Sequence, residues 1–198
     1  MHLSPAMGES VRELLSDLKD LCEHIVDLAY SAVIFDSRDM AEEVKRLEEE
    51  ADDIAHKLKI KAMLAARSIE DAEQLSNLLR IADASYIIAN AAADIVDLLE
   101  FGIEERGFLS FLLTEGDEKI KAVVISENSD LVGRKVKDLN VESESGVTII
   151  TLKRGRHWIH DIEELDEVTL KPGDVLIIRG TEDACDYFEK VAEGVENW

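Results

Sequence analysis

Apolar residues recur every three or four positions through the first half of the chain, which is the spacing of one face of an α-helix. One series runs from about Ser10 to Phe35 and a second from Val44 to Ala65. The second follows a nearly strict alternation of threes and fours over three heptads, a pattern typical of the seam between antiparallel helices. Two long helices are therefore predicted, separated by the polar turn Asp36–Asp39, whose residues favour capping and chain reversal.

A third helix is predicted to start at the capping box Ser68-x-x-Asp71. Its apolar side is rich in alanine, which lets a neighbouring helix approach closely, and consists of Leu75, Leu78, Ala82, Ser85, Ala89, Ala92, Val96 and Leu99. Three long helices joined by short turns predict an up-down-up antiparallel bundle over residues 1–114. The apolar stretch Phe108–Leu113 is expected to pack against the second domain or a second subunit.

The second half is richer in β-branched residues and in turn signals, and we expect a separate small α/β domain over residues 117–198. Gly155 can adopt positive φ, so Val147–Lys153 and His157–His160 are predicted to form a hairpin. Pro172-Gly173 predicts a type II turn before a buried strand that starts at Asp174. A strand over Lys119–Ile125 and a helix over Thr181–Val191 complete this domain. The fold class is thus α+β with two domains, divided at Thr114–Asp117.

Net charge and cysteine content restrict the partners and the location. The formal net charge is −22, so duplex nucleic acid and anionic membrane surfaces are poor partners for the chain as a whole. No apolar run approaches the ~18 residues of a membrane span, and no signal peptide is apparent at the start of the sequence, so no membrane insertion is expected. Cys22 and Cys185 are distant in sequence, which indicates buried thiols in a reduced, cytoplasmic protein.

Motifs of catalysis are missing from the sequence. No Gly-x-Gly-x-x-Gly follows a predicted strand, and there is no phosphate-binding Walker loop. Serine, histidine and cysteine residues are not grouped as a nucleophile with its base. The sequence therefore predicts a protein that is not an enzyme.

Acidic side chains line up at helical spacing on the first half. The second predicted helix carries Glu42, Glu49, Asp53 and His56 in one stripe, and the third carries Asp83, Asn90, Asp94 and Asp97. Carboxylates from neighbouring helices can form an oxygen-rich cation site. They can equally be the solvated face of an acidic bundle, which is the commoner outcome for charges at helical period.

Basic side chains concentrate at two places in the second half: Arg134, Lys135 and Lys137, and Lys153, Arg154, Arg156 and His157. Clustered arginine and lysine beside strand ends could bind an anionic ligand such as a nucleotide. A solubilising hairpin tip that prevents strand pairing between molecules is the alternative.

The glycine and turn motifs of the second half carry a family resemblance: Leu131-x-Gly133-Arg134-x-Val136, Gly146-Val147, Lys153-Arg154-Gly155, Leu170-x-Pro172-Gly173-Asp174-Val175-Leu176 and Gly180-Thr181. The segment 117–198 resembles the TrkA C-terminal (RCK C-terminal) domain of potassium-transport regulators. The resemblance implies a site for a small anionic regulator, such as a cyclic dinucleotide, at a dimer interface. The matching positions are Ile149, Arg154, Ile159 and His160, although His160-Asp161 replaces the Asn-Pro of many members.

The first half resembles one repeat of the PhoU family. The resemblance rests on Val44-x-x-Leu47-Glu48-x-x-Ala51-Asp52-x-Ile54 and on Leu79-Arg80-Ile81-Ala82-Asp83. PhoU bundles hold metal clusters on Glu/Asp-x-x-x-Asp motifs, which implies a divalent or ferric metal at Glu49, Asp53 and Asp83. Glu49-x-x-x-Asp53 keeps the motif, whereas Ile87 stands four residues after Asp83, where the family places a polar ligand.

Two functions follow from these resemblances. The first is a cytoplasmic regulatory subunit or adaptor, peripheral to a membrane transporter, that senses a small anionic ligand and tunes a potassium or other cation channel or transporter. The second is a metal-binding regulator of phosphate-transport signalling. Both imply a homodimer, because the alanine-rich third helix leaves apolar surface that a monomer would struggle to cover. The combination of the two domains resembles archaeal potassium channel-related proteins.

Overall fold

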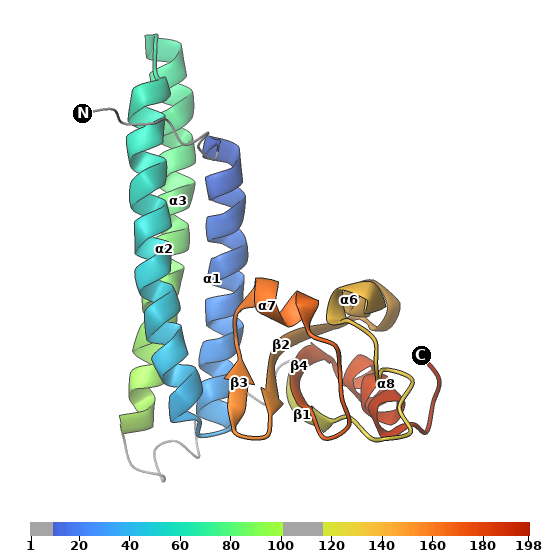
Figure 1. Cartoon of the computed structure of the whole chain (residues 1–198). Helices are drawn as coiled ribbons and strands as arrows, with labels where there is room; N and C mark the ends of the chain where they lie inside the picture. Colours follow the sequence, from blue (N-terminus) through green and yellow to red (C-terminus); the bar gives the residue numbers. More distant parts are fainter. Residues whose placement is uncertain (1–9, 101–116) are drawn as a thin grey trace, which may run out of the picture. The chain divides into compact units, whose positions relative to one another are not determined.

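The computed structural model describes residues 10–100 and 117–198, which fall into two compact units. One unit contains most of the three long helices, and the other contains all four strands. Figure 1 shows the path of the chain through the helices and strands.

The long helices are α1 (Val11–Ile34), α2 (Arg38–Ala65) and α3 (Ile69–Val96), and α3 continues into a short 3-10 turn, η1 (Asp97–Glu100). The helical unit contains them except for residues 30–40, which are the end of α1, the turn and the start of α2, and for the last residues of η1. The three helices lie side by side (Figure 1), which confirms the predicted three-helix bundle. The predicted seams are mostly buried, with Leu18, Val44 and Ala89 fully inaccessible. Ala65 is the exception, since it is exposed at the end of α2.

Local hydrogen bonds explain where α3 begins. The Ser68 hydroxyl accepts from the Asp71 N–H at 3.0 Å, as the predicted capping box requires. The Asp71 carboxylate accepts from the Arg67 N–H at 3.1 Å rather than from that of Ser68. A hydrogen bond also joins α1 to α3: the Cys22 thiol donates to the Ser85 carbonyl at 3.2 Å.

The strands form one antiparallel sheet in the order β1-β4-β2-β3, with β1 at Glu118–Val124, β2 at Val147–Arg154, β3 at His157–Ile159 and β4 at Val175–Thr181. The β2–β3 hairpin turns at Gly155, whose φ of 63° confirms the predicted turn. Gly173 has a φ of 84°, as a type II turn requires, and β4 follows it. A register shift between Ile149 and Thr151 on β2 marks a β-bulge.

Helix α8 (Glu182–Glu193) covers one face of the sheet and packs against β1 and β4. The Thr181 hydroxyl accepts from the Ala184 N–H at 3.3 Å, which confirms the predicted cap. The buried Phe188 of α8 joins Val123, Leu152 and Leu176 of the sheet in one apolar core.

Three short helices were not predicted: α5 (Val136–Leu139), α6 (Val141–Ser145) and α7 (Ile162–Glu167). Each has six residues or fewer, which is less than two turns and too short to show helical periodicity. They lie in the connections before β2 and after β3, where they contact one another and β2.

Two sequence predictions fall on residues outside the described ranges: the packing of Phe108–Leu113, and all but the last residue of the boundary Thr114–Asp117. Within residues 10–100 and 117–198, no helix is long and apolar enough to cross a membrane.

Candidate functional site

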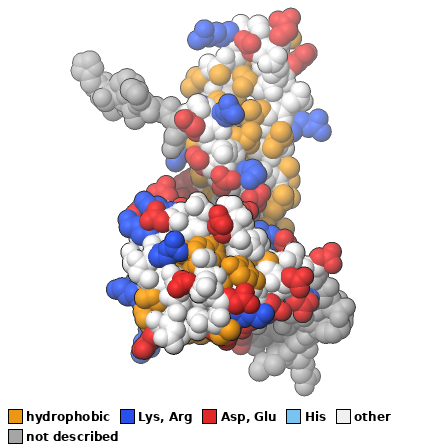
Figure 2. Space-filling view, turned by 90° about the vertical axis from the view of Figure 1, so that its right-hand side faces the viewer, with side chains coloured by type: hydrophobic (Ala, Val, Ile, Leu, Met, Phe, Trp, Pro, Cys, Tyr) orange, Lys and Arg blue, Asp and Glu red, His pale blue; other side chains and the backbone are white. Residues whose placement is uncertain are grey.

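A cavity of about 430 Å³ opens between β2 and the three short helices. Its apolar lining comes from Val136, Val141, Val147, Ile149, Ile162 and Leu165, and its polar lining from Lys137, Asn140, Glu142, Ser143, Thr148 and Asp166. Small-molecule sites usually combine apolar surface with polar groups that orient the ligand, and this lining supplies both. Figure 2 shows hydrophobic side chains grouped on the surface of residues 117–198, with charged side chains around them.

The backbone around Asn140 shapes one wall of this cavity. Asn140 ends α5 and begins α6 with a φ of 46°, a left-handed conformation that asparagine tolerates better than most residues. The Val136 N–H donates to the Val168 carbonyl at 3.0 Å, and an isolated bridge joins Lys135 to Thr169. These bonds hold α5 beside the end of α7.

The positive charge at the cavity edge is shared with one carboxylate. Lys135 Nζ lies 2.7 Å from Glu167, and Lys137 forms an ion pair with the same carboxylate. Hydrogen bonds from Lys135 and Lys137 lower the pKa of Glu167 to about 2, and the bond to Glu167 raises the pKa of Lys137. Lys135, Lys137 and Glu167 together carry one positive charge, but Glu142 and Asp166 also line the cavity, so these five side chains sum to one negative charge.

The hairpin end of β2 contains a buried ion pair. Arg154 donates to the two oxygens of Asp174 through Nε at 2.7 Å and Nη2 at 2.6 Å. The Asp174 side chain is 1% exposed and also accepts from the Lys171 N–H at 2.8 Å. Arg154 Nη2 donates to the Thr169 carbonyl at 2.9 Å as well. Because Asp174 stabilises the charged guanidinium, it raises the pKa of Arg154.

Residues 120–192 match the TrkA-C domain and residues 15–99 match the PhoU domain. The chain joins a PhoU domain to a TrkA-C domain. Both are typically regulatory, non-catalytic domains.

Curated relatives share parts of this arrangement. A probable potassium channel protein of Methanocaldococcus jannaschii is 28% identical over 132 residues, which covers 62% of this chain and 38% of the relative. An uncharacterized transporter of Synechocystis sp. is 37% identical over 68 residues, covering 34% and 11% respectively. The chain therefore spans well under half the length of both relatives.

Solved structures also resemble the chain. One is the RCK C domain of the potassium transport protein KtrA in complex with cyclic diadenosine monophosphate. Its sequence is 27% identical, the match covers 43% of this chain and 96% of the KtrA domain, and the TM-score is 0.35. Another is S. agalactiae BusR in complex with its promoter DNA. The BusR sequence is 19% identical, the match covers 89% of this chain and 97% of the BusR chain, and the TM-score is 0.35.

The four ligand positions predicted in the TrkA-C domain do not surround one cavity within the chain. Ile149 lines the cavity described above. Arg154 lies five residues further along β2, about 16 Å away in an extended strand, where it binds Asp174. Ile159 is 6% exposed and belongs to the core. Ligand binding by these four residues therefore stays a prediction.

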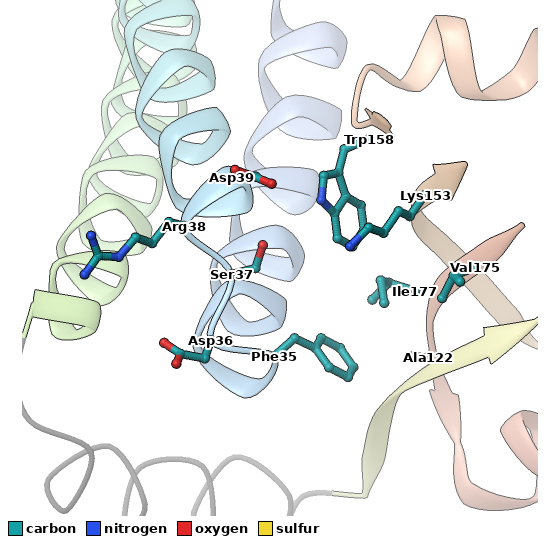
Figure 3. A pocket seen from close by; sticks show the side chains of 10 residues that line it. All are labelled: Phe35, Asp36, Ser37, Arg38, Asp39, Ala122, Lys153, Trp158, Val175 and Ile177. Atoms are coloured by element: carbon teal, nitrogen blue, oxygen red, sulfur yellow. The ribbon is translucent and has the colours of Figure 1, made fainter. Parts of the chain in front are cut away.

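His160 belongs to a network near β3. Trp158 stacks on the His160 ring with centroids 5.5 Å apart, and Lys153 Nζ lies 4.8 Å from the centre of the Trp158 ring. Figure 3 shows Lys153 and Trp158 side by side, with Val175 and Ile177 on the neighbouring strand. The Thr151 hydroxyl donates its proton to the Ile159 carbonyl at 2.8 Å. The same hydroxyl oxygen lies 2.9 Å from His160 Nδ1, and since its proton is already used, Nδ1 is the donor in this second hydrogen bond.

Sequence reasoning did not single out Trp158 or the cavity. The register pairs Lys153 with Trp158 across the β2–β3 hairpin, so the predicted hairpin would have placed them together. The cavity could not be found in this way, because the walls opposite β2 are the three short helices, which are too short to show helical periodicity.

The metal positions predicted in the PhoU domain lie on two helices. Glu49 and Asp53 are exposed on α2, and Asp83 of α3 pairs with Lys59 at 2.8 Å. Among the described residues, no three His, Cys, Asp or Glu side chains come together as a metal site. Metal binding by these residues stays a prediction.

Proposed function

We propose that this protein is a regulatory adaptor of potassium or other cation transport that senses a small anionic ligand through its TrkA-C domain. The observation that carries the proposal is the cavity between β2 and α5–α7, in a domain whose family is associated with potassium transport. We further propose a cytoplasmic homodimer that docks on a separate channel or transporter subunit.

The cavity suits a ligand with a flat apolar part and a phosphate. Its apolar lining, with Ile149 and Ile162 among it, offers surface for a nucleobase, while Asn140 and Thr148 offer hydrogen bonds. Lys137 lies at its edge and is paired with the exposed Glu167. A phosphate that binds Lys137 would replace a solvent-exposed pairing of low strength. Cyclic di-AMP and other adenine nucleotides fit this description.

Regulation requires more than binding. A ligand shifts a protein between two arrangements only if it binds one of them more tightly. The short helices α5, α6 and α7 are the elements that a ligand in the cavity would contact, so we expect them to carry the change toward a partner.

Thermal unfolding of the full-length chain, followed by tryptophan fluorescence, tests the proposal with cyclic di-AMP, ATP, ADP, AMP and pyrophosphate. At least one nucleotide should raise the midpoint, because a ligand that binds only the folded state stabilises it. Ser143→Trp should abolish that rise, since Ser143 is exposed and lines the cavity. Glu144→Trp is the matched control, because Glu144 is exposed on the same short helix and does not line it. If none of these compounds shifts the midpoint, ligand sensing is refuted.

The PhoU match favours a second candidate, metal-dependent phosphate-transport signalling. Its test is metal analysis of full-length protein purified without chelator, comparing wild type with Asp53→Ala and with Glu73→Ala, an exposed carboxylate of α3 outside both acidic stripes, as the control. Loss of a bound divalent or ferric ion in Asp53→Ala alone would support this function, and full retention would contradict it.

A further inference from the structure

Helix α3 has a second apolar stripe that faces solvent. Its buried face contains Ala82, Ala89, Ala92 and Val96. Beside that face lie Ile81, Ile87 and Ile88, whose side chains are 57%, 65% and 51% exposed, and the exposed Ala84 and Ala91. An exposed apolar patch of this kind usually marks an interaction surface.

The spacing of the stripe is that of a coiled coil. Ile81, Ala84, Ile88, Ala91 and Ile95 follow intervals of three, four, three and four, which keeps one seam against a partner helix. The stretch Ile81–Ile95 is about 21 Å long at 1.5 Å per residue. The seam would therefore accept one further helix along α3.

The charges at the edge of the stripe indicate which helix fits. Arg80 and Asp94 stand seven residues before and seven residues after Ile87, so all three lie on one edge of α3. Arg80 and Asp94 are exposed, and neither forms an ion pair with another residue in the described ranges. An antiparallel copy of the same helix, centred near Ile87, places each Arg80 opposite the other copy's Asp94.

We propose that α3 is the dimerisation helix of this protein and pairs antiparallel with α3 of a second copy about a two-fold axis near Ile87. The same patch is then used by both copies, as a closed two-fold interface requires. Pairs of Ile81 with Ala91 and of Ala84 with Ile88 alternate large and small side chains along the seam. This proposal names the surface of the homodimer proposed above, and it does not depend on ligand binding.

The length of the seam sets the expected strength. A single helix pair of about 21 Å lies near the lower end of specific interfaces, which begin at roughly 1,200 Å² of buried surface. We therefore expect a dissociation constant on the order of micromolar if α3 acts alone.

Cross-linking of the full-length protein tests the position of the axis. Ile87→Cys should form a covalent dimer with a short bis-maleimide, because the two thiols would lie near the axis. Ile69→Cys is the matched control: Ile69 is 79% exposed on the same helix but far from the proposed centre. The native Cys22 and Cys185 are buried, and burial raises the pKa of both thiols, so they should not react under these conditions. Equal cross-linking of both variants, or of neither, would overturn the proposed axis.

Charge exchange tests the antiparallel direction. Arg80→Asp and Asp94→Arg should each raise the dimer dissociation constant about tenfold in sedimentation experiments, because two like-charge contacts replace two ion pairs. The double variant should return close to the wild-type value. Failure of this rescue, or a wild-type chain that stays monomeric up to about 100 µM, would overturn the proposal. A dimer that passes these tests without binding any nucleotide would refute ligand sensing and leave the α3 interface intact.

Discussion

The ion pair between Arg154 and Asp174 makes a specific prediction about stability. Arg154→Ala would leave the Asp174 carboxylate, which is 1% exposed, with only the Lys171 N–H among the hydrogen bonds described above. Removing one partner of a buried ion pair typically costs about 3–5 kcal/mol. The Arg154 side chain is 35% exposed, so water can partly replace it, and we reduce the expected loss to about 2 kcal/mol.

Urea unfolding followed by tryptophan fluorescence measures this loss in the correct domain. Both tryptophans, Trp158 and Trp198, belong to the strand-containing half of the chain, so the signal reports on the TrkA-C domain. A loss of about 2 kcal/mol should lower the urea midpoint by roughly 1–2 M for a domain of this size. Arg154→Lys should recover part of it, because a lysine cannot form the two parallel bonds of the guanidinium.

Arg156→Ala is the matched control in the same hairpin. Arg156 is exposed, and its removal should change stability by less than about 0.5 kcal/mol. An Arg154→Ala midpoint equal to that of wild type would refute this reasoning. Arg154 would then be dispensable for the fold and available to a ligand, as the family resemblance predicts.

Three further outcomes are expected. Because the pKa of Glu167 is lowered to about 2, its contribution to stability is complete above the ordinary pKa of 4.5 and is lost as the pH falls below that value. The difference in urea midpoint between wild type and Glu167→Gln should therefore shrink from about pH 6 to about pH 3, and a constant difference would contradict the ion pairs. Gly194→Ala should destabilise the TrkA-C domain by about 2 kcal/mol or more in urea unfolding, because the added Cβ would lie 2.7 Å from the Asn128 carbonyl. Gly133→Ala is the control: Gly133 has a similar φ, nothing beyond its chain neighbours lies within 4 Å of the added Cβ, and the expected cost is about 1 kcal/mol. Ser68→Ala should remove the α3 cap and lower stability by about 1 kcal/mol in helix unfolding followed by circular dichroism, and an unchanged transition would contradict the role of the cap.

The long elements were predictable because their signals are local and repeated. The seams of α1, α2 and α3 extend over several turns each, and the turns at Gly155 and Gly173 need a backbone conformation that glycine favours. The short helices α5 to α7 gave no such signal, because each has six residues or fewer and depends on contacts with its neighbours.

The candidate site was less predictable for the same reason. The basic clusters are visible in sequence, but the acidic partners of three of their cations lie far along the chain: Asp174 for Arg154, and Glu167 for Lys135 and Lys137. Sequence could place Ile149 on a strand, yet only the packing of α5, α6 and α7 against β2 makes it part of a cavity.

The most direct test of the account is hydrogen exchange of the full-length protein with and without the nucleotide that stabilises it most. We predict protection of residues 136–149 and 162–166, which form the walls of the cavity. Protection confined to residues 153–160 would contradict the account, because the ligand would then bind the hairpin and not the cavity.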